Sequence, residues 1–242
     1  MLNPPFDLFA DLTKEEQENF DKRRNQMNAI VEGQMSSFAT DPNQRTIAEN
    51  RLVFKRSKLE NHVRPGLHHQ LLTKNECQNV LEICRRQAEW TVDRHSAFPT
   101  TDIPIRNHSP LSVLEPLVKE RLFDELADYY GFKTSDLAFR DIFLVKYSAN
   151  AQRGIKLHTD GCLFSFTLLI SDEHDFEGGG TYFASIDKVI HLKQGDVAYH
   201  AAKVSHCGVD ITHGERYILV GFIDTADTIA NDDRNNKHKL RN

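Results

Sequence analysis

The sequence predicts a mainly β fold of the α+β class, a double-stranded β-helix (jelly roll) supported by N-terminal helices. Two observations predict it. Four β-rich runs are separated by turn signals, at spacings typical of a sandwich or barrel: residues 164–170, 181–184, 189–192 and 217–222. Capping boxes precede polar or amphipathic stretches upstream of these runs, which indicates helices before the sheet.

Three helices are expected. A capping box at Thr13 and Glu16 begins a polar helix that reaches about Gly33. A second box at Thr73 and Glu76 begins a helix with one apolar face. That face consists of Cys77, Val80, Leu81 and Cys84. A third helix is predicted over residues 113–130, because apolar residues recur in phase there and Gly131 follows as a C-terminal cap.

The chain is long enough for one sizeable core, with 242 residues of which 39% are hydrophobic. We expect an N-terminal helical extension over residues 1–65, a single main domain over 66–226 and a polar C-terminal tail over 227–242. The tail lacks apolar periodicity, so it is expected to be a frayed extension.

Composition argues against several classes of partner. The formal net charge of -5 and the absence of a basic stripe argue against a nucleic-acid binder. There is neither a signal-peptide pattern nor a run of 18 apolar residues, which indicates no membrane partner and a cytoplasmic location. The four cysteines form no CxxC pair, so neither a zinc knuckle nor a dithiol redox motif is supported.

His158, Asp160 and His206 are candidate metal ligands. In an extended segment, residues two apart point to the same face, with Cα atoms roughly 6.5–7 Å apart, so both members of a His-x-Asp pair can reach one ion. Two imidazoles and one carboxylate fill one face of an octahedral iron and leave three positions open. The pair alone is weak evidence, since a solvated loop can carry it by chance. His200 competes with His206 as the third ligand.

Arg216 lies on a later predicted strand. By period two it faces inward with Ile218, Val220 and Phe222. A guanidinium directed into an apolar face is costly unless it is paired with an anion. We therefore expect a ligand carboxylate as its partner.

These residues and four further segments resemble the iron(II)/2-oxoglutarate-dependent dioxygenases of the prolyl and lysyl hydroxylase superfamily. The closest motif resemblance is to the collagen lysyl hydroxylase catalytic domain, where the ten-residue step from His206 to Arg216 has a counterpart and favours His206 over His200. The further segments follow in the same order: residues 99–103 (Pro-Thr-Thr-Asp-Ile), 143–147 (Phe-Leu-Val-Lys-Tyr), 176–180 (Phe-Glu-Gly-Gly-Gly) and 216–224. The resemblance covers roughly residues 66–226.

The resemblance assigns roles to named residues. It implies that His158, Asp160 and His206 hold iron and that Arg216 binds the distal carboxylate of 2-oxoglutarate. Tyr147 is implied as a second donor to that carboxylate, and Thr167 as a further contact to the same ligand. The alternatives are an ordinary core tyrosine and a strand threonine.

The family segment at residues 99–103 lies near the active-site side in the lysyl hydroxylases. Thr101 and Asp102 are therefore candidates for shaping the substrate mouth. A capped turn explains them equally well.

The resemblance implies an iron(II)- and 2-oxoglutarate-dependent hydroxylase that consumes O2 and releases succinate and CO2, with ascorbate as a further candidate cofactor. Asp160 favours hydroxylation, because related halogenating enzymes carry a small residue in its place. The substrate would be an aliphatic C–H, of a prolyl or lysyl type, in a protein or peptide or in a free amino acid. The sequence leaves the oligomeric state open.

A second hypothesis is a cupin-like jelly-roll module that binds metal or senses a ligand without oxygenase turnover. Arg216 argues against it, because such a module has no evident need for a buried guanidinium opposite the metal.

Overall fold

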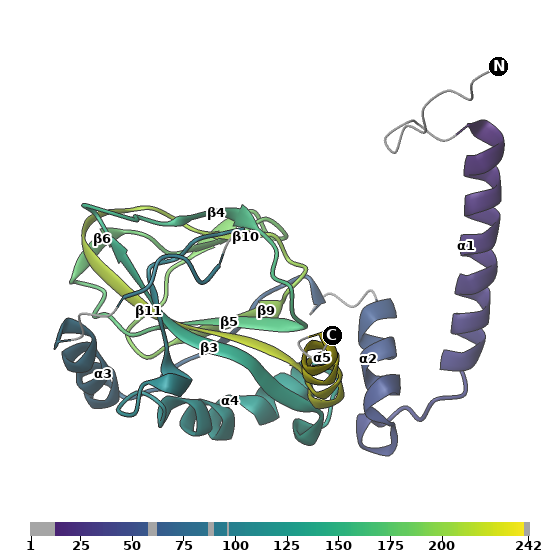
Figure 1. The fold of residues 1–242 in the computed structure, drawn as a ribbon, viewed down its shortest axis with the longest axis horizontal. Coiled ribbons are helices and arrows are strands. Elements are labelled where there is room, and N and C mark those ends of the chain that lie inside the picture. Colours follow the sequence, from purple (N-terminus) through teal and green to yellow (C-terminus); the bar gives the residue numbers. More distant parts are fainter. Residues whose placement is uncertain (1–12, 58–61, 87–89, 96, 240–242) are drawn as a thin grey trace. The chain divides into compact units, whose positions relative to one another are not determined.

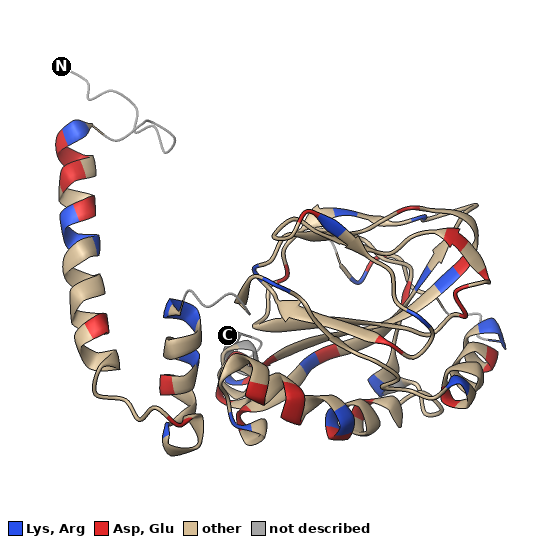
Figure 2. Ribbon diagram, turned by 180° about the vertical axis from the view of Figure 1, so that it is seen from behind, with Lys and Arg blue, Asp and Glu red and all other residues tan. Residues whose placement is uncertain are grey.

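The computed structural model describes residues 13–57, 62–86, 90–95 and 97–239, and the chain divides into two compact units, Met1–Arg45 and Thr46–Asn242. The first unit contains α1 (Lys14–Met35) and a 3-10 turn (Pro42–Gln44). The predicted capping box is confirmed, since Thr13 caps α1 together with Glu16. No residue of α1 is buried, and acidic and basic residues are interspersed along it (Figure 2).

The second unit is a sandwich of two antiparallel sheets with helices around it (Figure 1). Its helices are α2 (Ile47–Arg56), α3 (Lys74–Arg86), α4 (Leu114–Tyr130) and α5 (Ala226–Lys239), with 3-10 turns at Ile105–Asn107 and Thr134–Asp136. Across the part of the chain that the structure describes, every helix is too short or too polar to span a bilayer.

The larger sheet has the order β1 (Gly66–His68), β9 (Val197–Ala201), β5 (Phe164–Leu169), β11 (Ile211–Thr225), β3 (Leu137–Ser148) and β2 (Asp102–Pro104), and β6 (Phe176–Gly178) also pairs with β11. The smaller sheet has the order β4 (Ile155–His158), β10 (His206–Gly208), β7 (Thr181–Phe183) and β8 (Lys188–Ile190). The predicted jelly roll is confirmed, and the four predicted β-rich runs fall on β5, β7, β8 and β11.

The core lies between the larger sheet and the helices α3 and α4, which cover the face turned away from the smaller sheet (Figure 1). All four residues of the predicted apolar face of α3 are buried. Gly131 ends α4 with a φ of 75°, as its position predicted. The ring of Phe166 packs directly against Gly221 of β11. A Cβ at this position would lie 2.2 Å from the ring, so only glycine fits there.

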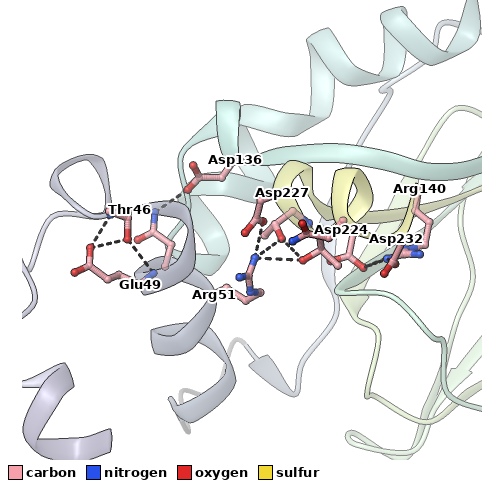
Figure 3. A network of polar contacts seen from close by, with 12 residues as sticks. Thr46, Glu49, Arg51, Asp136, Arg140, Asp224, Asp227 and Asp232 are labelled. Atoms are coloured by element: carbon pink, nitrogen blue, oxygen red, sulfur yellow. Dashed lines mark hydrogen bonds and ion pairs between the residues drawn. The ribbon is translucent and has the colours of Figure 1, made fainter. Parts of the chain in front are cut away.

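Two helices were not predicted, and one prediction about the tail is wrong. The described part of the tail forms α5 instead of fraying, because its acidic residues bind arginines of other elements (Figure 3). Asp227 accepts a hydrogen bond from Arg51 of α2, and Asp232 lies 2.7 Å from Arg140 of β3. These contacts are polar and remote in sequence, so apolar periodicity could not reveal them.

The other unpredicted helix, α2, belongs to the second unit. Its Asn50 is fully buried and donates a hydrogen bond of 2.8 Å to Asp136, and its Phe54 packs against the rings of Tyr130 and Phe164. The Thr46 and Glu49 capping box at its start is a signal that could have predicted it. The domain limit expected between residues 65 and 66 stays a prediction.

Glu76 has two tasks at the start of α3. Its carboxylate accepts a hydrogen bond of 2.8 Å from the backbone N–H of Thr73 and two more, of 2.9 and 2.8 Å, from Arg121 of α4. The hydrogen bond from Arg121 is the main reason that the pKa of Glu76 falls from its ordinary 4.5 to about 2. Glu76 therefore caps α3 and, through Arg121, holds α3 against α4.

Glu76→Gln is expected to lower the free energy of unfolding by about 1 kcal/mol at pH 7. Because the pKa of Glu76 is lower in the folded than in the unfolded chain, its contribution is present above pH 4.5 and is lost as the pH falls toward 2. Urea unfolding at pH 7 and pH 3 should show a smaller difference between variant and parent at the lower pH. Glu82→Gln, which removes an exposed pair with Arg86, is the control. An equal loss at both pH values would contradict the assignment.

Candidate active site

The three predicted metal ligands converge in the smaller sheet. His158 ends β4 and His206 begins β10, and the register of the two strands places them opposite each other. Asp160 follows β4, where its backbone N–H donates to the carbonyl of Ala202. One ligand atom from each of the three residues lies within 4.8 Å of the other two. The Nε2 atoms of His158 and His206 lie 3.5 and 3.6 Å from the carboxylate oxygens of Asp160.

The imidazoles are oriented for binding an ion. Nδ1 of His158 lies 2.7 Å from the carbonyl of Lys156, and Nδ1 of His206 lies 3.0 Å from the carbonyl of Val204. Because a carbonyl oxygen can only accept, each Nδ1 carries a proton, so the neutral form of each ring has its lone pair on Nε2, facing the other ligands. A histidine held in this way through its second nitrogen is the usual arrangement around a protein-bound metal.

Asp160 is held as a carboxylate. Burial raises its pKa, but the hydrogen bond with His158, the charge of His206 and the hydrogen bond from Ser165 outweigh burial and leave the pKa lowered. Ser165 donates to one oxygen of Asp160 and fixes its orientation. We did not predict this serine, although it lies two residues before Thr167 on β5 and so shares its face. The donor set, with two imidazoles and one carboxylate, fits ferrous iron.

The three residues line a cavity of about 420 Å³ between the two sheets. The inward face predicted by period two is confirmed, since Arg216 lines this cavity together with Ile218, Val220 and Phe222 of β11. Tyr147, paired with Arg216 in the register of β3 and β11, also lines it.

Arg216 is a buried cation without an anion. Its side chain is only 2% exposed, and its one hydrogen bond among the described residues, 3.4 Å long, goes to the carbonyl of Gly180. No carboxylate of the described residues lies within 4.0 Å of the guanidinium, whose other neighbours are the rings of Tyr147 and Phe176. Burial lowers the pKa of Arg216, but an arginine stays charged in proteins. The cavity therefore presents an unpaired positive charge to a ligand.

The surroundings of Arg216 suit a bound anion. Burial raises the pKa of Tyr147 to about 12, so its hydroxyl keeps its proton and can donate. Gly208 leaves room for that hydroxyl, because a Cβ there would lie 3.0 Å from it. Thr167, 9% exposed, lines the same cavity. The structure thus brings Tyr147 and Thr167 into one cavity with Arg216 and the three metal-ligand candidates.

Thr101 and Asp102 do not line this cavity. Thr101 donates its backbone N–H to Gln152, and Asp102 is fully buried. The carboxylate of Asp102 instead accepts hydrogen bonds of 2.6 Å from Thr100 and 2.8 Å from Arg94, both of which line the cavity. Asp102 supports the wall of the cavity from behind, and a direct contact with substrate stays a prediction for both residues.

His200, the competing third ligand, lies beside the cluster but not in it. Its ring centroid is 4.2 Å from that of His206, and the side chain lines the cavity. Its Nδ1 lies 3.1 Å from the carbonyl of Ala201, and burial is the main reason that its pKa falls to about 3. His200 is therefore neutral, while the set of three that share one centre contains His206.

A jelly roll that encloses two histidines, one carboxylate and a buried arginine has the architecture of the iron(II)/2-oxoglutarate oxygenases. A solved structure of such an oxidoreductase from Burkholderia pseudomallei superposes with a TM-score of 0.53 at 14% identity, over 75% of this chain and 92% of the other. The shared fold therefore extends over most of that protein.

Two curated relatives are similar to this chain in sequence. Human procollagen-lysine,2-oxoglutarate 5-dioxygenase 2 is 26% identical over 168 residues, which is 64% of this chain but 23% of that protein. A PKHD-type hydroxylase of Synechococcus is 27% identical over 178 residues, covering 67% of this chain and 79% of the other. No family model matches the chain. The resemblance indicated by the sequence motifs is confirmed, with this chain spanning less than a quarter of the procollagen-lysine relative.

Proposed function

We propose that this protein is an iron(II)- and 2-oxoglutarate-dependent dioxygenase that hydroxylates an aliphatic C–H and releases succinate and CO2. The C–H belongs to a prolyl- or lysyl-type side chain in a protein or peptide, or to a free amino acid. One observation carries the proposal: the unpaired, buried guanidinium of Arg216 shares one cavity with the His158, Asp160 and His206 cluster.

Each residue of the cavity then has a task. His158, Asp160 and His206 would hold the iron, with Ser165 fixing the orientation of the carboxylate. Bound iron supplies the activation of O2 that is coupled to oxidative decarboxylation of 2-oxoglutarate. The chain itself orients the cosubstrate and excludes water.

Arg216 orients the cosubstrate by a charge-assisted, two-pronged hydrogen bond to its distal carboxylate. The hydroxyl of Tyr147 donates to the same group, and Thr167 contacts it from β5. Apolar side chains of β11, including Ile218 and Val220, line the wall next to Arg216 and exclude water from that end of the cavity. A dry site strengthens the pairing of the guanidinium with its anion.

Purified full-length protein loaded with iron(II) should release succinate and CO2 from 2-oxoglutarate in the presence of O2 and ascorbate. Pyruvate, a 2-oxo acid without the distal carboxylate, should not replace it, because Arg216 would be left unpaired. Equal turnover of the two acids would contradict the role of Arg216. Absence of succinate under all conditions would favour the metal-binding module without turnover. The cytoplasmic location stays a prediction.

A further inference from the structure

We infer that the substrate half of the cavity accepts an uncharged side chain and discriminates against an ammonium group. The inference rests on the proposed function, because it concerns the primary substrate of the same site. It narrows the proposed substrates to those with a neutral side chain, because a lysyl side chain carries a charge that this half of the cavity does not accommodate.

Aromatic rings surround the end of the cavity away from Arg216. The ring of Phe98 lies tilted beside that of the metal-ligand candidate His158, with ring centroids 4.8 Å apart. Phe143 packs edge to face with Phe222 at 5.3 Å, and the ring of His95 lies 4.8 Å from Phe143. All of these side chains line the cavity. A C–H bond presented to the metal therefore lies among apolar surfaces.

Within the described lining of the cavity, no carboxylate is free to pair with a substrate cation. Asp160 is the only acidic residue among the described residues that line the cavity, and its oxygens already face His158, His206 and Ser165. The remaining ionised lining residues are cations, Arg94 and Arg216. An ammonium group near the metal would thus find no unused anion among the described lining residues.

The two carboxylates behind the wall are occupied. Arg94 donates to Asp102 and to Asp141, and the remaining oxygens of these groups accept from Thr100 and from the backbone N–H of Ile142. A substrate cation that used either carboxylate would compete with Arg94 for it and weaken an ion pair behind the wall.

The aromatic rings are a weaker partner for a cation than a carboxylate, and one of them already has a cation beside it. A cation can bind over the face of an aromatic ring, but the guanidinium of Arg94 already lies 5.1 Å from the centroid of Phe143. Burying an unpaired charge is strongly unfavourable, whereas a neutral aliphatic side chain gains by leaving water. A substrate with a neutral side chain should therefore be hydroxylated much more than one with an ammonium group.

The test uses four peptide pools with the same randomised flanks and lysine, ε-N-acetyl-lysine, norleucine or proline at the centre. Each pool is incubated with the iron-loaded full chain, 2-oxoglutarate and O2, and mass spectrometry measures the gain of one oxygen atom at the central residue. The four free amino acids form a parallel panel. We expect at least one neutral residue to be hydroxylated at least about tenfold more than lysine.

Lysine hydroxylated as well as or better than every neutral residue would overturn the inference. If succinate is released but no neutral residue gains oxygen, the inference fails while the proposed function stands. If no succinate is released under any condition, the proposed function fails and the inference fails with it.

Phe98→Glu tests the electrostatic reason. Placing a carboxylate at the mouth should raise the ratio of lysine to norleucine hydroxylation about tenfold, because the ammonium then has a partner. Phe98→Leu controls for loss of the ring, and Val92→Glu adds the same charge at a position that is 63% exposed and does not line the cavity. Neither control should change the ratio. An unchanged ratio in a folded Phe98→Glu variant would contradict the proposed basis of the discrimination.

Discussion

Alanine in place of His158, Asp160 or His206 is expected to reduce release of succinate from 2-oxoglutarate by at least about a hundredfold. Each substitution removes one of three ligands, and the described residues contain no other cluster of this kind to replace it. Succinate release and iron binding should fall together. His213→Ala, an exposed position outside the cavity, is the control and should keep parent activity.

These three substitutions should leave the fold intact. The ligand side chains lie in a cavity and are not part of the hydrophobic core between the larger sheet and its helices. We therefore expect the free energy of unfolding of the metal-free protein to change by no more than about 1 kcal/mol. Circular dichroism and urea unfolding would measure this. Full activity in any of the three variants would contradict the ligand assignment, whereas loss of activity with loss of folding would leave a structural role as the explanation.

Arg216→Lys is expected to raise the KM for 2-oxoglutarate by roughly tenfold to a hundredfold, with a smaller effect on kcat. An ammonium keeps the charge but replaces a planar fork with a single point, so the loss corresponds to a charge-assisted hydrogen bond of about 1.5–3 kcal/mol. Steady-state kinetics with varied cosubstrate would measure it. Arg85→Lys, half exposed and outside the cavity, is the matched control. Parent affinity in the Arg216 variant would exclude the carboxylate clamp.

The sequence could predict the positions that follow a local rule. Arg216 was placed in the cavity by the alternation of a strand, and α3 and α4 were predicted from capping residues and helical periodicity. His158 and Asp160 come together as the sequence predicts, although β4 ends at His158 and Asp160 lies beyond the strand. The helix α5 could not be found in this way, because distant arginines stabilise it and not an apolar stripe.

The sequence predicted that Phe222 faces inward, but not that it forms one wall with residues of other elements. Arg94, Phe98, Phe143 and Phe222 come from separate elements and meet only when the sheet forms. The direction of the Asp102 side chain could not be predicted from the sequence either. The motif at residues 99–103 predicted that this segment lies near the active site. Only the pairing of β2 with β3 shows that the carboxylate of Asp102 is turned inward to hold Arg94.

The position of β4 at the edge of the smaller sheet links ion binding to local opening. Among the described strands, β4 pairs only with β10, and it carries one of the three ligands at its end. An ion bound to His158 and His206 would bridge these two strands and oppose their separation. Without the ion, β4 would therefore separate from β10 more easily, while the larger sheet would stay folded.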